Sequence, residues 1–285
     1  MRTHAISLLS LLPLVSAVPA PAYPGFKTIW SDAFEGSAGS PPDQGVWNII
    51  TGLHVNNEVQ SYTTSNQNLQ LSGGSTVQLV PRRSPSGEWT SARIESKATF
   101  TPAPGKLTQF EAAIRFGDHA AALKQGMWPA FWLLGDAVHH GTPWPLCGEL
   151  DIMETVNGLP TAYGTLHCGD GARGGPCNEP NGRGGTVALP DYGWHTWTLQ
   201  VDRTNAGGDW RGETIRWLVD GHKFKEITGA EIGDQGIWAT LAHSPVFMIL
   251  NVAVGGDWPG APSAATADSW GSMMEVEYVA VYETA

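Results

Sequence analysis

The segment GELDIMETVNG (148–158) places three carboxylates within six residues and interleaves them with apolar side chains. Buried acids are costly, so the pattern favours a strand with one acidic face and one apolar face that packs in a core. Side chains alternate between the two faces of a strand. Glu149 and Asp151 therefore share a face, whereas strict alternation would put Glu154 on the other one.

A β-bulge would return the third acid to its face. One extra residue at Ile152 or Met153 is enough, and bulges are common beside active sites. The alternative is one turn of an amphipathic helix with a solvated acidic face, on which Asp151 and Glu154 would be neighbours. The flanking glycines, the β-branched Ile152 and the lack of basic residues four positions away favour the strand.

This acidic ladder, defined as Glu149, Asp151 and Glu154, suggests a reaction. Retaining glycoside hydrolysis uses two carboxyls about 5–5.5 Å apart, one as nucleophile and one as acid/base. The outer Cα atoms of a bulged ladder lie about 13 Å apart. Only long side chains on a concave surface close that gap, and both ends of the ladder are Glu.

Seven blocks of sequence follow one another in a characteristic order. They are NNEVQSYT (56–63), TSARIES (90–96), WPAFWLLG (128–135), CGELDIMETVNG (147–158), GTLHCG (164–169), NVAVGGDWPG (251–260) and VEYVAVYE (276–283). Together they resemble glycoside hydrolase family 16, the laminarinase-like endo-β-1,3-glucanases with the bulged E-x-D-x-x-E spacing. The resemblance implies that Glu149 is the nucleophile, Glu154 the acid/base and Asp151 the assisting residue.

The predicted fold class is all-β, an antiparallel β-sandwich of the jelly-roll, concanavalin-like type with a concave substrate cleft; the resemblance implies the same fold. Residues 195–202 alternate like a strand, 214–227 contain an Asp220-Gly221 hairpin turn, and the apolar run 246–254 suits a central strand. Thirty-five glycines and twenty prolines supply the many turns that such a sheet requires.

Residues 1–22 have the pattern of a signal peptide, with cleavage after Ala17 or Ala20 or at the end of this segment. Residues 23–285 are then expected to form a single catalytic domain of a secreted, monomeric protein. The formal net charge of −11 argues against nucleic acid and anionic membranes as partners. A neutral polysaccharide fits this surface.

Tryptophans are the natural platforms for sugar rings. Trp128 and Trp132 are four residues apart, so a strand puts both on one face; we expect Trp128 in the cleft, whereas Trp132 suits cleft or core equally. Trp258 lies in a loop rich in glycine and proline, which favours a sugar-binding role. Its alternative is to plug one end of the sandwich.

Three polar residues are further candidates for substrate binding. The resemblance favours sugar contact for Asn57, although capping of a local turn is the alternative. Arg93 could reach sugar hydroxyls or pair with an acid. His167 could act near the acid/base or be structural, whereas His139 and His140 are expected to be exposed loop residues.

The three cysteines suggest one disulfide. Cys168 and Cys177 could close a short loop in a secreted protein, which leaves Cys147 as a buried, inert thiol; pairing of Cys147 with either of them is the alternative. A zinc cluster that includes His167 lacks the usual ligand spacing. No cofactor is required.

The resemblance allows a structural calcium ion. Asp32, Glu35 and Glu283 could supply oxygen ligands, but no dense loop of Asp and Asn demands the ion.

The expected activity is endo-hydrolysis of β-1,3-glucan, with mixed β-1,3/1,4-glucan as a further substrate. The segment HHGTPWPLCGE (139–149) departs from the plainest laminarinase pattern and keeps β-1,3-galactan open as an alternative. Transglycosylation by the same ladder is another alternative. A non-catalytic jelly-roll lectin is a different class, but a lectin has no use for a paired acid and nucleophile.

Overall fold

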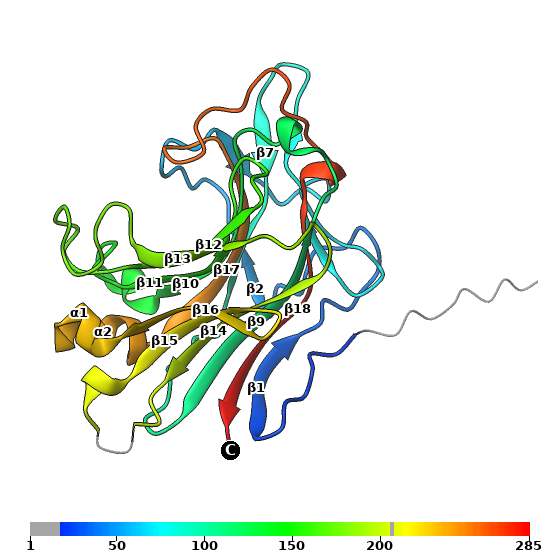
Figure 1. The fold of residues 1–285 in the computed structure, drawn as a ribbon. Helices are drawn as coiled ribbons and strands as arrows, with labels where there is room; N and C mark the ends of the chain where they lie inside the picture. Colours follow the sequence, from blue (N-terminus) through cyan, green and yellow to red (C-terminus); the bar gives the residue numbers. More distant parts are fainter. Residues whose placement is uncertain (1–17, 206–207) are drawn as a thin grey trace, which may run out of the picture.

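The computed structural model describes residues 18–205 and 208–285, and two antiparallel sheets stack face to face in it (Figure 1). The outer sheet has the order β16-β15-β14-β9-β18-β5-β4, and β1 also pairs with β18. Its strands are β1 (Phe26–Asp32), β4 (Leu69–Leu71), β5 (Val77–Leu79), β9 (Leu107–Phe116), β14 (His195–Asp202), β15 (Thr214–Val219), β16 (His222–Thr228) and β18 (Met274–Thr284).

The inner sheet has the order β13-β12-β11-β10-β17-β8-β2. Its strands are β2 (Trp47–Ile49), β8 (Arg93–Ser96), β10 (Met127–Gly135), β11 (Glu149–Glu154), β12 (Thr161–His167), β13 (Arg183–Ala188) and β17 (Val246–Val254). A small third sheet joins β3 (Gln60–Tyr62), β7 (Trp89–Ser91) and β6 (Arg82–Arg83), and its β3–β7 pair is parallel. The predicted jelly-roll sandwich is confirmed.

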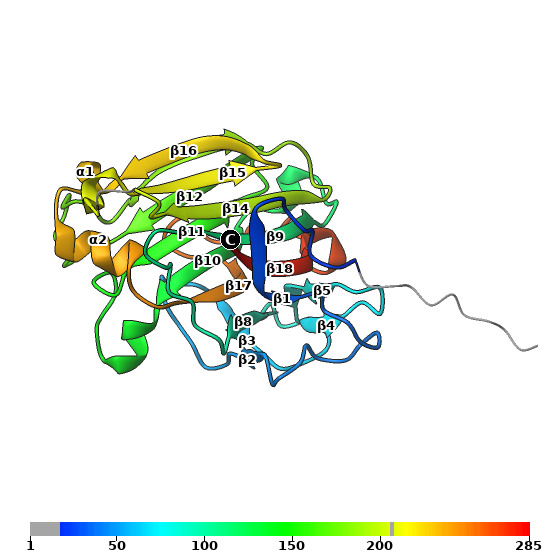
Figure 2. The same cartoon turned by 90° about the horizontal axis from the view of Figure 1, so that it is seen from below.

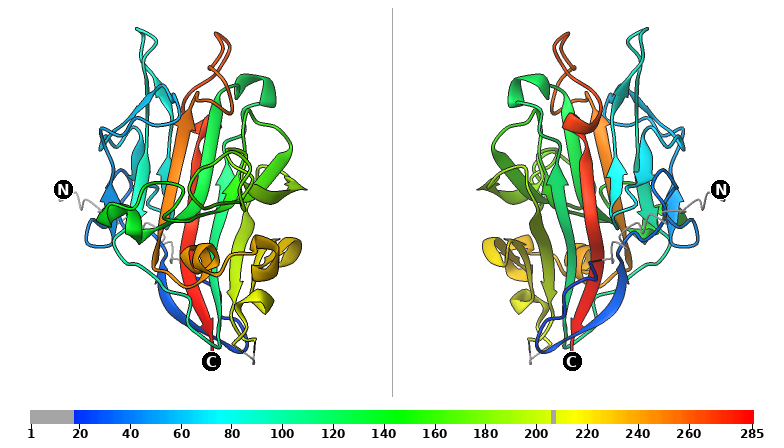
Figure 3. Two further views of the ribbon diagram at one scale, coloured as in Figure 1. Left: turned by 90° about the vertical axis from the view of Figure 1, so that its left-hand side faces the viewer. Right: turned by 90° about the vertical axis from the view of Figure 1, so that its right-hand side faces the viewer.

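Helices are short and lie outside the sheets. The α-helices α1 (Gly229–Ile232) and α2 (Gln235–Ala242) lie together near one end of the sandwich (Figures 1 and 2). Single 3-10 turns are η1 (Ala121–Leu123), η2 (Asp136–His140), η3 (Trp210–Gly212) and η4 (Trp270–Ser272). The C-terminus lies at the opposite end of the sandwich from the orange loop that follows β17 (Figure 3).

The core between the sheets follows the predicted alternation. On β14, Trp197, Leu199 and Val201 are buried in the main apolar cluster. Asp220 and Gly221 both have positive φ and connect β15 to β16, as the hairpin prediction requires. The central strand β17 is buried over all nine residues, which explains its unbroken apolar run.

The predicted bulge is present at Ile152. Against β10, Asp151 pairs with Trp132 and Met153 pairs with Phe131, so Ile152 is the extra residue. Ile152 and Met153 both point into the core, which turns Glu154 back to the acidic face. The indole N–H of Trp217, on the outer sheet, donates to the backbone carbonyl of Asp151 at 2.7 Å. The two sheets therefore share a hydrogen bond at the bulge.

The first residues of the described chain lie against the outer sheet. Ala20 and Tyr23 pack against a small cluster that includes Tyr282, and the Tyr23 hydroxyl donates to Glu111. Most of the predicted signal peptide, residues 1–17, lies outside the described residues. Within the described ranges, no helix has the length and apolar character needed to span a membrane.

Candidate active site

The acidic ladder lies on the exposed face of the inner sheet, beside a cleft of about 490 Å³. Strands β8, β10, β11 and β17 supply the floor, so the ladder on β11 borders a platform that extends across three further strands. The residues that line the cleft include Arg93, Glu95, Trp128, Trp132, Trp144, Glu149, Asp151, Glu154, Phe247 and Asn251.

The three ladder carboxyls are shielded from solvent to different degrees. Asp151 is 4% exposed and Glu154 is 8% exposed, whereas Glu149 is half-buried. One carboxylate oxygen each from Glu149 and Asp151 and one ring nitrogen of His167 lie within 4.8 Å of one another. This group is compact enough to hold a metal ion, but acid–base chemistry needs the same carboxyls, so we assign no metal to them.

Burial dominates the electrostatics of the ladder. It raises the pKa of Glu149 to about 8 and of Glu154 to about 7, and it raises the pKa of Asp151 well above its usual range. Repulsion between the ladder carboxylates adds to the rise at Glu149 and Asp151. Three carboxyls this close cannot all be ionised near neutral pH, so the ladder retains at least one proton.

Two indoles hold the outer carboxyls. Trp128 donates its N–H to Glu154 at 2.8 Å, and Trp144 donates to Glu149 at 3.1 Å. Both hydrogen bonds favour the ionised carboxylates and lower their pKa, which opposes burial. The positive charge of Arg93 also lowers the pKa of Glu149. The order of the two pKa values by itself would leave the proton on Glu149. Glu149 is nevertheless the more exposed of the two and has Arg93 nearby as well as its indole donor, so on these contacts we assign the charge to Glu149 and a proton to Glu154.

The structure places Trp132 and Arg93 together in the cleft. The Arg93 guanidinium lies 4.8 Å from the centre of the Trp132 ring and pairs with Glu95 at 2.7 Å. The Trp132 N–H donates to Asn251 at 2.8 Å. Trp132 is therefore a cleft residue, and Arg93 pairs with an acid while it also lines the cleft.

The remaining sugar-binding candidates, Trp258 and Asn57, are not among the residues that line the cleft. Trp258 packs edge-on against Trp128 and Tyr163, with ring centres 5.4 and 4.9 Å apart, and 43% of it is exposed. Asn57 donates to Asp257 at 2.8 Å, and its neighbour Asn56 lines the cleft in its place.

His167 lies beside the ladder on β12, paired with Glu149 in the sheet, and is not among the residues that line the cleft. Its Nδ1 is 2.9 Å from Glu179, and its Nε2 is 3.8 Å from Asp151. Sequence reasoning missed Glu179, which has no local pattern, and Trp144, whose position in the WPLCGE stretch that ends at Glu149 is a usable signal. His139 and His140 are exposed, as expected, and lie in η2; His139 also stacks on Phe247, with ring centres 4.6 Å apart, and lines the cleft.

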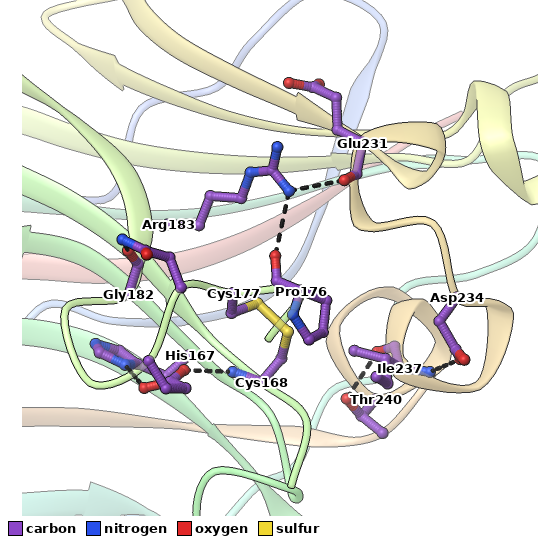
Figure 4. The surroundings of a disulfide bond; sticks show 12 residues. His167, Cys168, Pro176, Cys177, Gly182, Arg183, Glu231, Asp234, Ile237 and Thr240 are labelled. Atoms are coloured by element: carbon purple, nitrogen blue, oxygen red, sulfur yellow. Dashed lines mark hydrogen bonds and ion pairs between the residues drawn. A yellow bond between two sulfur atoms is a disulfide. The ribbon is translucent and has the colours of Figure 1, made fainter. Parts of the chain in front are cut away.

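The cysteine prediction is confirmed. Cys168 and Cys177 form a disulfide with a Cα–Cα distance of 5.4 Å (Figure 4). Cys147 is a free thiol that is 1% exposed, and burial raises its pKa to about 11.

The suggested calcium ligands do not converge on one site. Asp32 accepts hydrogen bonds from the Trp47 indole and the Phe34 amide, and Glu283 faces Lys27 near the other end of β1. The calcium prediction therefore rests on the resemblance alone.

Comparison with known proteins gives consistent matches. Residues 55–230, more than half of the chain, match a family model described as XgeA-like, catalytic GH16 domain. A beta-glucanase of Rhodothermus marinus is 31% identical over 91% of this chain and 86% of its own length. A glucan endo-1,3-beta-glucosidase A1 of Niallia circulans is 30% identical over 92% of this chain, but the match spans 39% of that longer protein. The solved endo-1,3-beta-glucanase of Streptomyces sioyaensis has a TM-score of 0.87 and 36% identity, and the match covers 94% of this chain and all of that one.

Proposed function

The chain belongs to glycoside hydrolase family 16, and on that premise we propose that it is a retaining endo-β-1,3-glucanase. The observation that carries the mechanism is the bulged ladder, which puts a half-buried Glu149 and a shielded Glu154 on one face of β11. The relatives named as endo-1,3-β-glucanases support the substrate class.

Glu149 and Glu154 have different roles in the two displacement steps of this mechanism. Glu149 attacks the anomeric carbon while Glu154 gives its proton to the departing glycosidic oxygen, which leaves a covalent glycosyl-enzyme. Formation of that ester removes the charge on Glu149. Because the two carboxylates repel each other, Glu154 then ionises more readily and can take a proton from water. The water attacks the anomeric carbon, and Glu149 is released as a carboxylate.

The cleft supplies groups suited to a neutral glycan. Trp128 and Trp132 offer indole surfaces, and Arg93, Glu95 and Asn251 offer fixed polar groups between them. No charged group of the glycan is needed for binding, which agrees with the acidic composition of the chain.

Incubation with laminarin, lichenan, β-1,3-galactan and agarose tests the proposal, with products followed by size and by proton NMR of the anomeric form. We expect rapid loss of laminarin chain length and initial release of the β-anomer. Glu149→Gln and Glu154→Gln should each abolish turnover while the thermal unfolding stays cooperative. Initial α-anomer contradicts retention, cleavage of galactan alone corrects the substrate, and no cleavage at all favours the lectin alternative.

We further propose that the protein acts outside the cell as a monomer. The apolar stretch within residues 1–22 and the disulfide support secretion, because disulfides persist mainly in oxidising compartments. No cofactor enters the proposed reaction. A structural calcium ion remains a prediction, and a fall in melting temperature on addition of a chelator would support it.

A further inference from the structure

A row of polar side chains crosses the outer sheet on the side of the sandwich away from the cleft. Gln70 on β4 pairs with Gln78 on β5, and Gln78 pairs in turn with Glu275 on β18. Glu275 pairs on its other side with Arg115 on β9. Residues directly opposite each other on antiparallel strands share a face, so these four side chains lie together. The neighbours of Gln78 along β5 are fully buried in the core, so the shared face is the outer one.

The row ends at an exposed tryptophan. His195 pairs with Ile114, so Trp194, one residue earlier, comes opposite Arg115. The Arg115 guanidinium lies 5.1 Å from the centre of the Trp194 ring, and 39% of Trp194 is exposed. The strands β4, β5, β18, β9 and β14 lie side by side (Figure 2), and their spacing of about 4.8 Å gives the row a length of about 19 Å. We call the five residues the outer row: Gln70, Gln78, Glu275, Arg115 and Trp194.

Hydrogen bonds hold the members of the outer row in place. Glu275 is 3% exposed, and its two oxygens accept from Arg115 Nε at 2.6 Å and from Gln78 Nε2 at 2.9 Å. Gln70 donates to the amide oxygen of Gln78 at 3.0 Å. The Arg115 side chain nevertheless stays 42% exposed. The exposed groups are therefore ordered before a ligand binds, which lowers the entropic cost of binding.

The cleft contains the same combination of groups. There the guanidinium of Arg93 lies over the Trp132 ring and pairs with Glu95. In the outer row, Arg115 lies over Trp194 and pairs with a glutamate in the same way. The indole, guanidinium and carboxylate that border the proposed glucan cleft thus recur on the opposite side of the sandwich.

The outer row suits an uncharged ligand rich in hydroxyl groups. The charges of Arg115 and Glu275 compensate each other, so the row offers no free charge to an ionic ligand. The amides of Gln70 and Gln78 carry both hydrogen-bond donors and acceptors, as sugar hydroxyls require. The indole of Trp194 adds an apolar surface at one end of the row.

We propose that the outer row is a second, non-catalytic binding site for a neutral β-1,3-glucan chain. The Trp194 ring packs against a sugar ring, and the polar groups of the row bind its hydroxyls and those of the neighbouring sugars. Because the site lies on the side of the sandwich away from the ladder, the chain bound there is not the chain being cut. It keeps the enzyme on an insoluble polysaccharide. The identity of the glycan rests on the proposed function.

Co-sedimentation with an insoluble linear β-1,3-glucan tests the proposal, with Glu149→Gln as the background so that the polymer is not cut. Adding Trp194→Ala should weaken binding by roughly 2- to 10-fold, the range expected for one aromatic contact. With Glu149 intact, Trp194→Ala should keep the wild-type kcat/KM on a laminarin pentasaccharide, which needs only the cleft. Gln78→Ala gives the same test if Trp194→Ala fails to fold.

Trp270→Ala is the matched control. Trp270 is 40% exposed and lies under the Arg82 guanidinium at 5.0 Å, but Arg82 binds Ser269 instead of a carboxylate, and Trp270 is outside the row. This variant should bind the polymer like its background. Unchanged binding in a folded Trp194→Ala overturns the proposal, and so does an equal loss in Trp270→Ala, which would mean that any exposed indole suffices. Failure of the wild type to cleave the pentasaccharide refutes the proposed function and leaves the binding test of the outer row standing.

Discussion

Trp217 lies on the outer sheet, across the core from the acidic ladder. We predict that Trp217→Phe displaces the ladder and lowers the catalytic rate. Trp217 is fully buried on β15, and its N–H reaches across the core to the carbonyl of Asp151 beside the bulge. A Cβ on Gly164, which lies opposite the bulge on β12, would overlap the Trp217 ring, so the fit is tight. Phe keeps most of the packing but removes the only donor that Trp217 offers to this carbonyl.

The expected loss of stability follows from the Asp151 carbonyl, which the substitution leaves without a hydrogen-bond partner. A buried acceptor that loses its partner costs about 1–3 kcal/mol, in addition to the cost of the smaller ring. For a chain of this size, that hydrogen bond corresponds to roughly 2–12 °C in melting temperature. If the freed bulge relaxes and the ladder shifts by about 1 Å, the catalytic rate could fall by on the order of 100-fold.

Trp197→Phe is the matched control. Trp197 is equally buried on the adjacent strand β14, and its indole nitrogen has no hydrogen-bond partner within the described ranges. It therefore reports the cost of the smaller ring without the loss of a hydrogen bond, less the gain from removing a buried N–H that has no partner. Differential scanning calorimetry should give a larger loss for Trp217→Phe, and only that variant should lose kcat on laminarin. Equal stability losses in the two variants, or full turnover by Trp217→Phe, would refute the reasoning.

Four further predictions concern protonation and sulfur chemistry. Burial raises the pKa of Glu154 from 4.5 to about 7, so kcat/KM should fall as the pH rises above about 7 and the acid loses its proton; a profile that rises to pH 9 would contradict this role. The same shift means that the folded state favours the protonated form, so stability is lost as the pH rises through about 7; Glu154→Gln should therefore unfold at a higher temperature than the wild type at pH 8 and at a similar one at pH 4. A thiol reagent should find no reactive cysteine in the native protein and one after unfolding, because Cys147 is buried, and the double variant Cys168→Ser/Cys177→Ser should lose about 2–3 kcal/mol of stability in urea titrations.

Local patterns in the sequence were sufficient to predict much of the fold. Alternation on β14, the Asp220-Gly221 turn and the run on β17 each depend on a few adjacent residues, and the structure has all three. The helices α1 and α2 were missed because they are short, and their caps at Thr228 and Asp234 give little periodic signal.

The acidic ladder was also a local prediction. Three acids that must share one face of a strand require a register shift, and the pairing of β10 with β11 has that shift at Ile152. The fully buried Cys147 and the Cys168–Cys177 disulfide could be predicted for a similar reason, since the loop between the bonded pair is short.

The sequence by itself determined the class of fold, the bulged ladder and the chemistry that three carboxyls on one face can perform, because these depend on residues close together in the chain. Only the tertiary structure decided which groups hold the ladder. Trp217 comes from the opposite sheet, His167 beside the ladder is held by Glu179 from the segment after Cys177, and Trp132 enters the cleft through its contacts with Arg93 and Asn251. These contacts join residues far apart in the chain, and the periodicity of one strand carries no information about its partners across a sheet or a core.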